Sequence, residues 1–187
     1  MWFRSLVGRR LLAREADAYR ALDGLEGVPK LLSWDGTCRL VISYIEGAPL
    51  PEAPPERLDE AFFDDLAALL HRIHDRGVAC ADLHHRNVIV SPFGKPSLVD
   101  FAMANVRDVR GSGPLSKWLF HRLAALDEAA LTRMRTRYLR RLPTPAEQEI
   151  LRRGLWLRRA GRTFKRALPT LRPASGPDGG GPVNRSP

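Results

Sequence analysis

The chain has few cysteines and no long run of apolar residues. Its two cysteines, Cys38 and Cys80, lie far apart, and neither belongs to a Cys-x-x-Cys pair. This spacing argues against a zinc site or a disulfide framework, so we expect two reduced thiols in the core. No apolar stretch approaches the roughly 20 residues of a membrane-spanning helix. The apolar start, interrupted by Arg4 and Gly8, is too short for a secretory signal, so we expect a cytoplasmic protein.

Acidic residues are also scarce relative to basic ones. The 187 residues include 30 Lys and Arg against 21 Asp and Glu, which gives a net charge of +9. The length suits a single domain with a proper core. A basic chain favours a negatively charged partner, and charge alone leaves nucleotide, phospholipid, lipopolysaccharide core and nucleic acid open.

Hydrophobic spacing predicts an α+β fold. Apolar residues recur at helical intervals over 8–22 and over 56–76, and Gly77 is the expected C-cap of the second helix. Residues 31–34 and 39–44 read as antiparallel strands around an Asp-Gly turn, followed by a proline-rich connector. The core stripe of the second helix consists of Phe62, Leu66, Leu69 and Ile73.

The most informative segment is ACADLHHRNVIVSPFGKPSLVDFAMA, residues 79–104. It carries Asp82, then Asn87 at the start of a short apolar strand, and Asp100 at the end of a second strand. A hairpin of these strands would bring the three polar side chains to one rim. Phosphoryl transfer needs one carboxylate near the attacking hydroxyl and oxygen ligands for Mg²⁺, and this set supplies both. A lone Asp or Asn would indicate only a turn.

These residues resemble the protein-kinase-like superfamily, whose catalytic loop reads His-Arg-Asp, four residues, Asn, and whose metal loop reads Asp-Phe-Gly. The resemblance implies that Asp82 is the catalytic base, that Asn87 binds magnesium beside it, and that Asp100 is the principal magnesium ligand. His84, two residues after the base, is placed with the catalytic residues. It stands where Ser/Thr protein kinases usually have Lys, which is closer to aminoglycoside and lipopolysaccharide-core kinases.

Two positions depart from the family pattern. Cys80 stands where the family commonly has a histidine that braces the catalytic loop, and a thiol cannot make the same hydrogen bonds. Ala102 replaces the glycine of Asp-Phe-Gly, which restricts the backbone without removing a ligand. His71 and His74 lie one turn apart on the helix expected over 56–76, but without a third ligand we interpret them as surface or supporting residues rather than a metal site.

The same resemblance assigns the nucleotide side of the site. It implies that Glu15 is the helix glutamate that normally pairs with a strand lysine, and that the segment after the hairpin is the hinge that meets adenine. The expected nucleotide-binding residues are Ile42, Ser43, Tyr44, Ile45 and Glu15.

No glycine-rich loop and no lysine precede Glu15 in this sequence. Three explanations remain open. The start of the chain is truncated or misassigned, an arginine such as Arg9, Arg10 or Arg14 substitutes for the lysine, or the protein is a pseudokinase that acts as a scaffold.

The resemblance implies a reduced N-terminal lobe with the hinge over 1–50 and a mainly helical C-terminal lobe over 51–168. Helices are expected over 115–142 and 151–168, and arginines crowd this region. Residues 169–187, rich in Gly, Pro and Ser, are expected to be a disordered tail.

Together these features predict an ATP- and Mg²⁺-dependent kinase that transfers the γ-phosphate to a protein Ser/Thr or to a lipopolysaccharide-core sugar. The alternative is a pseudokinase scaffold whose basic C-terminal helices bind anionic membrane or another acidic partner, with peripheral contact at the inner membrane. Nucleic acid ranks last as a partner, because the basic helices offer few aromatic residues for stacking beyond Tyr138, Trp156 and Phe164.

Overall fold

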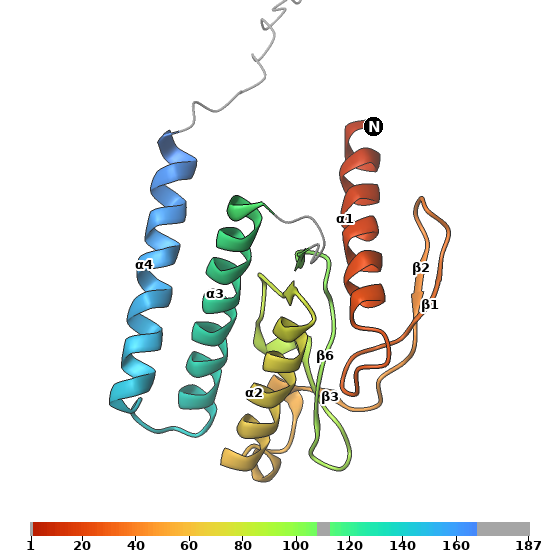
Figure 1. The fold of residues 1–187 in the computed structure, drawn as a ribbon. Helices are drawn as coiled ribbons and strands as arrows, with labels where there is room; N and C mark the ends of the chain where they lie inside the picture. Colours follow the sequence, from red (N-terminus) through yellow and green to blue (C-terminus); the bar gives the residue numbers. More distant parts are fainter. Residues whose placement is uncertain (1, 108–112, 168–187) are drawn as a thin grey trace, which may run out of the picture.

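The computed structural model describes the backbone of residues 2–107 and 113–167, and the side chains of residues 8–107 and 113–157. Over these ranges the fold is α+β, with four α-helices and three small antiparallel sheets. The helices stand roughly side by side, with α4 outermost beside α3 and α1 at the opposite edge (Figure 1). The expected tail over 169–187 lies outside the described residues.

The N-terminal part is a helix followed by a hairpin. Helix α1 spans Trp2–Ala21, β1 spans Leu31–Trp34 and β2 spans Leu40–Ile42. The two strands pair antiparallel, with Trp34 opposite Leu40, which confirms the predicted hairpin. Asp35 shapes its turn, because one carboxylate oxygen accepts the backbone N–H groups of Thr37, Cys38 and Arg39 at 2.7, 3.0 and 3.1 Å. These bonds lower the pKa of Asp35 to about 2.

The expectation for Cys38 was wrong. Its thiol is exposed in this turn, whereas Cys80 is buried as expected. The reason is that the Asp35 turn places the backbone of residue 38 outside the sheet, where its side chain finds no core to enter.

Two further sheets organise the middle of the chain. Strand β5 (Val88–Val90) pairs antiparallel with β6 (Pro96–Leu98) and with β3 (Ala48–Pro49). Strand β4 (Val78–Ala79) pairs antiparallel with β7 (Asn105–Val106). Short 3₁₀ turns lie at Leu50–Glu52, Pro55–Arg57 and His85–Asn87. The hairpin predicted on either side of the polar turn is therefore present as β5 and β6.

Helix α2 spans Glu60–Asp75, a later start than the expected residue 56. Prolines 54 and 55 begin a separate 3₁₀ turn, and Asp59 then caps α2 by accepting the backbone N–H of Phe62 at 2.8 Å. The helix ends as expected before Gly77, whose φ of +77° is the left-handed conformation that favours glycine. The predicted core stripe is confirmed, because Phe62, Leu66, Leu69 and Ile73 are each at most 2% exposed.

Helices α3 (Pro114–Tyr138) and α4 (Pro145–Ala167) form an antiparallel pair. Helix α3 ends earlier than expected, because Arg140 adopts a φ of +50° that breaks the helix. Helix α4 begins earlier than expected, because Thr144 and Glu147 form a capping box. In it the backbone N–H of Thr144 donates to the Glu147 carboxylate at 2.8 Å, and that of Glu147 donates to the Thr144 hydroxyl at 3.3 Å.

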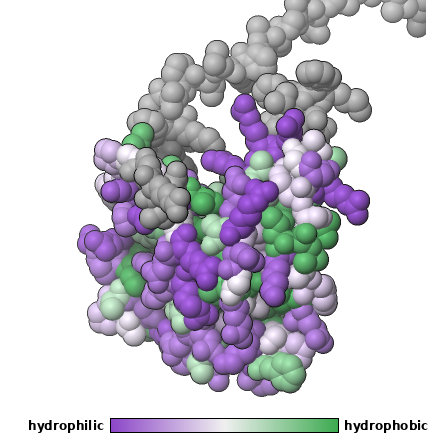
Figure 2. Space-filling view, turned by 45° about the vertical axis from the view of Figure 1, so that its right-hand side comes forward, coloured by the Kyte–Doolittle hydropathy of each residue, from purple (hydrophilic) through white to green (hydrophobic). Residues whose placement is uncertain are grey.

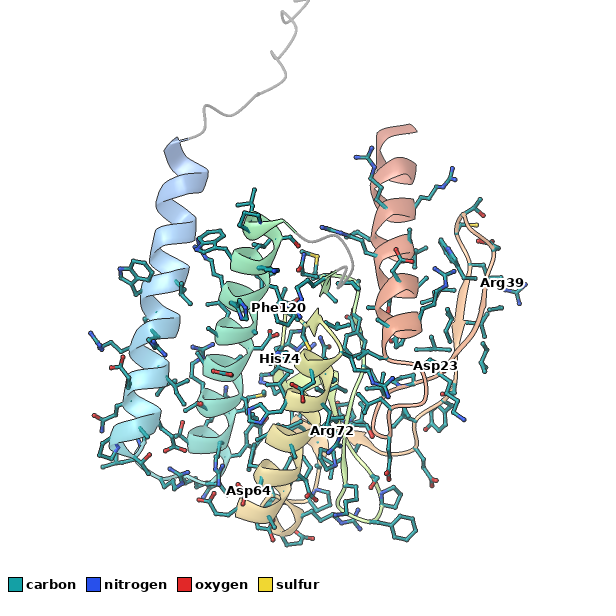
Figure 3. The ribbon with its side chains drawn as sticks, viewed as in Figure 1. Asp23, Arg39, Asp64, Arg72, His74 and Phe120 are labelled. Atoms are coloured by element: carbon teal, nitrogen blue, oxygen red, sulfur yellow. The ribbon has the colours of Figure 1, made fainter. Side chains whose placement is uncertain are left out.

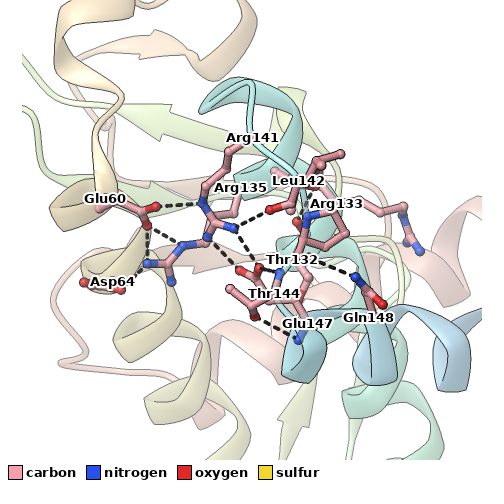
Figure 4. A network of polar contacts seen from close by, with 12 residues as sticks. Glu60, Asp64, Thr132, Arg133, Arg135, Arg141, Leu142, Thr144, Glu147 and Gln148 are labelled. Carbon is pink, nitrogen blue, oxygen red and sulfur yellow. Dashed lines mark hydrogen bonds and ion pairs between the residues drawn. The ribbon is translucent and has the colours of Figure 1, made fainter.

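A polar network joins α2, α3 and the start of α4 (Figure 4). Arg141 donates to Glu60 at 2.7 Å and forms a forked pair with Glu147 at 2.7 and 2.8 Å. Arg135 pairs with Glu60 and, at 2.8 Å, with Asp64. Arg141 therefore connects the first turn of α2 to the capping box of α4.

A single hydrophobic cluster joins the first fifty residues to the rest of the described chain. It includes Ala18 of α1 and Leu22 just after this helix, together with Leu69 of α2 and Leu98 of β6. Within it the rings of Tyr19 and Phe101 meet edge to face, with their centroids 5.3 Å apart. Figure 2 brings the side with α1 and the β1–β2 hairpin forward, and hydrophilic residues cover most of that face.

Candidate functional site

The structure brings Asp82, Asn87 and Asp100 to one rim through two hydrogen bonds. The Asn87 side-chain amide donates to the backbone carbonyl of Asp82 at 3.3 Å. The backbone N–H of Val99 donates to the backbone carbonyl of Asn87 at 3.0 Å, which places Asp100 next to Asn87. Asn87 is buried, whereas Asp82 and Asp100 are exposed, so the two carboxylates face solvent from a fixed loop.

Two backbone positions at this rim lie in the left-handed region. Ala81, directly before Asp82, has a φ of +63°, and Asp100 has a φ of +65°. Asp is found in this conformation fairly often. In alanine it is unfavourable, because the Cβ atom comes too close to a backbone carbonyl oxygen. Such positions persist only where the surrounding structure enforces them, and they concentrate at functional sites. The loop with Asp82 is therefore held in a shape that the alanine before it does not favour.

Glu15 of α1 reaches the same rim. Burial raises the pKa of Glu15, and the negative charge of Asp100 raises it further, while the Phe101 backbone N–H and the Tyr19 hydroxyl act in the opposite direction. No basic side chain among the described residues forms an ion pair with Glu15. Glu15 and Asp100 therefore lie close enough to interact electrostatically.

Tyr19 closes the inner side of this carboxylate pair. Its hydroxyl is buried and makes no hydrogen bond of normal geometry within the described structure, although Glu15 and the Asp100 backbone lie within its electrostatic reach. Burial and the charge of Glu15 raise the pKa of Tyr19 well above its usual range, so the hydroxyl stays protonated. A protonated hydroxyl is a donor available to an oxygen at this position.

Asp127 anchors the loop that carries Asp82. Its Oδ2 accepts the backbone N–H of Cys80 at 2.8 Å, and its Oδ1 accepts that of Ala81 at 2.9 Å. Asp127 lies on α3 and is 1% exposed. Burial raises its pKa, and the hydrogen bonds from His74 and from the two amides oppose that rise. Sequence reasoning did not find this residue.

A signal for Asp127 is nevertheless present in the sequence. Phe120, Ala124, Asp127, Leu131 and Met134 follow helical spacing, and all five are buried. An acid in the middle of an otherwise apolar stripe must find donors inside the protein, because an unpaired buried carboxylate is costly. The stripe therefore marks Asp127 as a residue with an internal partner.

His74 completes the anchor. Its Nε2 lies 3.2 Å from Asp127 Oδ2, and its ring meets the edge of Phe120 with centroids 6.3 Å apart. Figure 3 shows His74 and Phe120 facing each other between α2 and α3. The interpretation of His74 as a supporting residue therefore agrees with its position, while His71 is exposed on α2.

The two histidines after Asp82 shape the loop. His84 Nδ1 accepts the backbone N–H of Arg86 at 3.2 Å, so this side chain caps the 3₁₀ turn that ends at Asn87. Burial lowers the pKa of His85, and the positive charges of Arg137, His84 and Arg86 lower it further. His84 thus has a structural role in positioning Asn87, and its predicted catalytic role stays a prediction.

Cys80 lies at the position where a histidine was expected to brace the loop, and its thiol does not take over that role. Its thiol is buried, and burial together with the nearby Asp127 raises its pKa well above the ordinary value. The loop is braced through the backbone N–H of this residue rather than through its side chain. The carboxylate of Asp127 therefore holds the loop at the backbone of Cys80.

The segment expected to be the hinge follows β2. The backbone N–H of Ser43 donates to the Lys30 carbonyl at 2.8 Å, and the Ser43 hydroxyl accepts the Lys30 backbone N–H at 2.8 Å. This amide is therefore already used within the chain. Tyr44 is 85% exposed, and Ile42 and Ile45 are partly buried. Contact of these residues with adenine stays a prediction.

Within the described residues, no group of three or more His, Cys, Asp and Glu side chains is arranged to hold a metal ion. Asp100 and Asn87 supply a carboxylate and an amide oxygen, so this pair can hold Mg²⁺ only together with phosphate or water oxygens.

No helix in the described part of the chain is long and apolar enough to cross a membrane. No protein-family model matches the chain, and no sequence among the curated proteins matches it.

Proposed function

We propose that this chain is a phosphotransferase of the protein-kinase-like kind, which transfers the γ-phosphate of Mg·ATP to a hydroxyl group. The observation that carries the proposal is the hydrogen-bonded succession from Asp82 through Asn87 to Val99 and Asp100. It joins one exposed carboxylate, one amide and a second exposed carboxylate at one rim, which is the set that phosphoryl transfer uses.

Asp82 would act on the acceptor. Its carboxylate faces solvent beside the loop, where the hydroxyl of an incoming acceptor can donate a hydrogen bond to it. The proton passes to Asp82 as the hydroxyl oxygen bonds to the γ-phosphorus, and ADP leaves with the electrons of the broken bond. The anchoring of Ala81 by Asp127 would fix the direction of this carboxylate.

Asp100 and Asn87 would hold the metal. Magnesium supplies charge neutralisation for the transferring phosphate when it is bound. The residues present fit a cation, because the negative charge of Asp100 helps to raise the pKa of Glu15 and no ion pair with Glu15 is found among the described residues. Asn87 uses its amide N–H in the loop, which leaves the side-chain oxygen as its ligand atom.

The acceptor in this proposal is a hydroxyl on a protein or on a glycolipid sugar. The first fourteen residues contain no lysine, so contact with the α- and β-phosphates falls to arginine in this proposal. Arg9, Arg10 and Arg14 are exposed on α1, the same helix as Glu15, and one of them would serve as the phosphate contact.

Two measurements on the full chain test the proposal. The first is calorimetric titration with Mg·ATP, and the second is the rate of the slow release of phosphate from ATP in the absence of an acceptor. We expect saturable binding that chelation of Mg²⁺ abolishes. Asp100→Asn should lose this binding, whereas Asp82→Asn should keep it and lower turnover by about 10² to 10⁴-fold.

Asp75→Asn is the matched control, because Asp75 is an exposed carboxylate at the end of α2 and is not one of the residues assigned to the acceptor, the metal or the nucleotide. It should behave as the unmodified protein in both measurements. An absence of Mg-dependent nucleotide binding, or equal binding by the Asp100→Asn variant, would refute the proposed function.

A further inference from the structure

Helices α3 and α4 expose large apolar side chains on the side away from the candidate site. Trp118 is 55% exposed and Trp156 is 67% exposed, on facing helices. Both line a groove of about 990 Å³ between α3 and α4. Tryptophan is seldom left this open in a folded protein without a partner.

Helical spacing gathers further residues onto the same surface. On α3, Leu115, Trp118, Leu119 and Arg122 follow the i, i+3, i+4, i+7 pattern, and the two leucines are 74% and 38% exposed. We call this surface of α3 and α4, centred on Trp118 and Trp156, the tryptophan face. It presents apolar side chains in a row rather than as isolated residues.

The tryptophan face is also cationic. Arg122, Arg152 and Arg153 line the groove against a single acid, Glu149. The side chains of Arg152 and Arg153 are 79% and 77% exposed, and both pair with that glutamate. After Glu149, the sequence of α4 continues to its end at Ala167 with only basic residues among its charged ones. Three arginines against one acid leave an excess of positive charge on the face.

Arg122 fixes one of the tryptophans. Its guanidinium lies 5.3 Å from the centre of the Trp118 ring and donates to the backbone carbonyl of Leu157 at 2.8 Å. This bond crosses from α3 to α4, so Trp118 projects from a rigid junction. A preorganised aromatic side chain loses little conformational freedom when it binds.

We propose that the tryptophan face docks the protein peripherally on an anionic lipid bilayer. Tryptophan and leucine side chains partition to the boundary between headgroups and acyl chains, while arginines beside them meet lipid phosphates. Exposed leucines beside Trp118 on α3 favour a lipid surface over nucleic acid, which would need stacking rings at those positions. The excess of arginine favours anionic over neutral lipid.

This inference does not rest on the proposed phosphotransferase activity. The two sites do share α3: Trp118 precedes Asp127, the anchor of the Asp82 loop, by a rise of about 14 Å at 1.5 Å per residue.

The test is co-sedimentation of the full chain with vesicles of phosphatidylcholine, either pure or containing one quarter phosphatidylglycerol. We expect binding to the mixed vesicles that weakens as salt shortens the Debye length from about 10 Å at 0.1 M to about 3 Å at 1 M. The double variant Trp118→Ser/Trp156→Ser should bind at least about tenfold more weakly. The double variant Arg152→Gln/Arg153→Gln should lose about fivefold in binding for each arginine.

Phe93→Ser/Leu142→Ser is the matched control, because these side chains are 91% and 88% exposed but lie outside the tryptophan face. It removes comparable exposed apolar surface and should bind vesicles as the unmodified protein does. The circular dichroism of all variants should be unchanged, since no substituted side chain belongs to the core.

Three results would overturn the proposal. The first is equal sedimentation with neutral and anionic vesicles, or with neither. The second is full binding by the tryptophan variant, which would assign lipid contact to another part of the chain. The third is concentration-dependent self-association in sedimentation velocity that the tryptophan variant abolishes, which would make this face a contact between two copies of the chain.

Discussion

Asp127 Oδ1 lies 2.9 Å from the backbone nitrogen of Ala81, the residue directly before Asp82. A buried carboxylate on α3 thereby determines the conformation of a loop that follows α2. The same carboxylate accepts the Cys80 amide and faces His74, so all three donors around it come from α2 and the segment after it. Stability and the placement of Asp82 therefore depend on one side chain.

We expect Asp127→Ala to lower the free energy of unfolding by about 3 to 5 kcal/mol, the usual cost of breaking a buried pair by removing one partner. His74 and two backbone amides would be left without their acceptor. Chemical denaturation measures the change. Glu128→Ala is the control, because Glu128 is the neighbouring acid and is only partly buried. Equal denaturation midpoints for the Asp127→Ala variant and the unmodified protein would contradict the anchoring role.

We expect Ala81→Gly to raise the stability of the protein and to lower its nucleotide turnover. Glycine removes the Cβ atom that makes a φ of +63° unfavourable, and this relief exceeds the entropic cost of glycine by up to about 1 kcal/mol. We expect a slightly more stable protein whose nucleotide turnover falls, because the loop before Asp82 becomes freer. Denaturation and the phosphate-release measurement test the two parts.

Arg140→Gly is the matched control for this substitution. Arg140 also has a positive φ, of +50°, but it lies after α3 and away from the rim. It should gain stability in the same way without a change in turnover. A loss of turnover of the same size in both variants would disprove the link between the Ala81 conformation and Asp82.

The Arg141 network should make the protein sensitive to acid. Hydrogen bonding to Arg141 lowers the pKa of Glu147 to about 2 from an ordinary value of 4.5. A lowered folded-state pKa contributes stability that is complete above about pH 4.5 and is lost as the pH falls toward about 2. Because solvent screens this pair, we expect a contribution of about 1 kcal/mol or less.

Glu147→Gln should therefore be less stable than the unmodified protein at pH 7 and equal to it near pH 2. Thermal unfolding followed across this range measures the convergence. Glu149→Gln is the comparison, because its pairing with Arg152 lies on the exposed surface of α4. A difference that persists unchanged to the lowest pH would show that Glu147 acts through packing instead of charge.

Close packing of α3 against α4 depends on Gly154. A Cβ atom at this position would lie 2.4 Å from the Cβ of Ala129, which is too close for any real contact. We expect Gly154→Ala to destabilise the protein by about 1 to 3 kcal/mol despite the better helix propensity of alanine. The double variant Gly154→Ala/Ala129→Gly should recover most of this loss.

Gly8→Ala should have the opposite effect on stability, because a Cβ atom at Gly8 in α1 would meet nothing within 4 Å. It should stabilise the protein by up to about 1 kcal/mol. Denaturation of Gly154→Ala, Ala129→Gly, the double variant and the unmodified protein forms a double-mutant cycle. Gly8→Ala is the independent reference. If the changes in unfolding free energy of the two single variants simply added up in the double variant, the close contact between Gly154 and Ala129 would not limit the packing of α3 against α4.

Local patterns predicted much of the fold. The core stripe of α2 and the β5–β6 hairpin follow from hydrophobic spacing and turn residues, which act over short stretches of chain. Thr144 and Glu147 have the spacing of a capping box and so indicate the start of α4, whereas hydrophobic periodicity alone predicts a start that is too late. The partnership of Asp127 with Cys80 was not predictable from local rules, since 47 positions separate the two residues. The exposure of Cys38 likewise depends on how Asp35 folds the turn around itself.

The distance in sequence between Asp127 and the loop that it anchors also has a consequence for synthesis. The ribosome releases the Asp82 loop before it releases α3, and chain growth proceeds at about 5 to 20 residues per second. Until α3 emerges and docks, the amides of Cys80 and Ala81 lack the acceptor that shapes them. A nascent chain therefore passes through an interval in which its helices α1 and α2 exist but its rim of carboxylates has no fixed form. The loop before Asp82 therefore takes its final shape only after α3, the helix that follows it in the sequence, has been made.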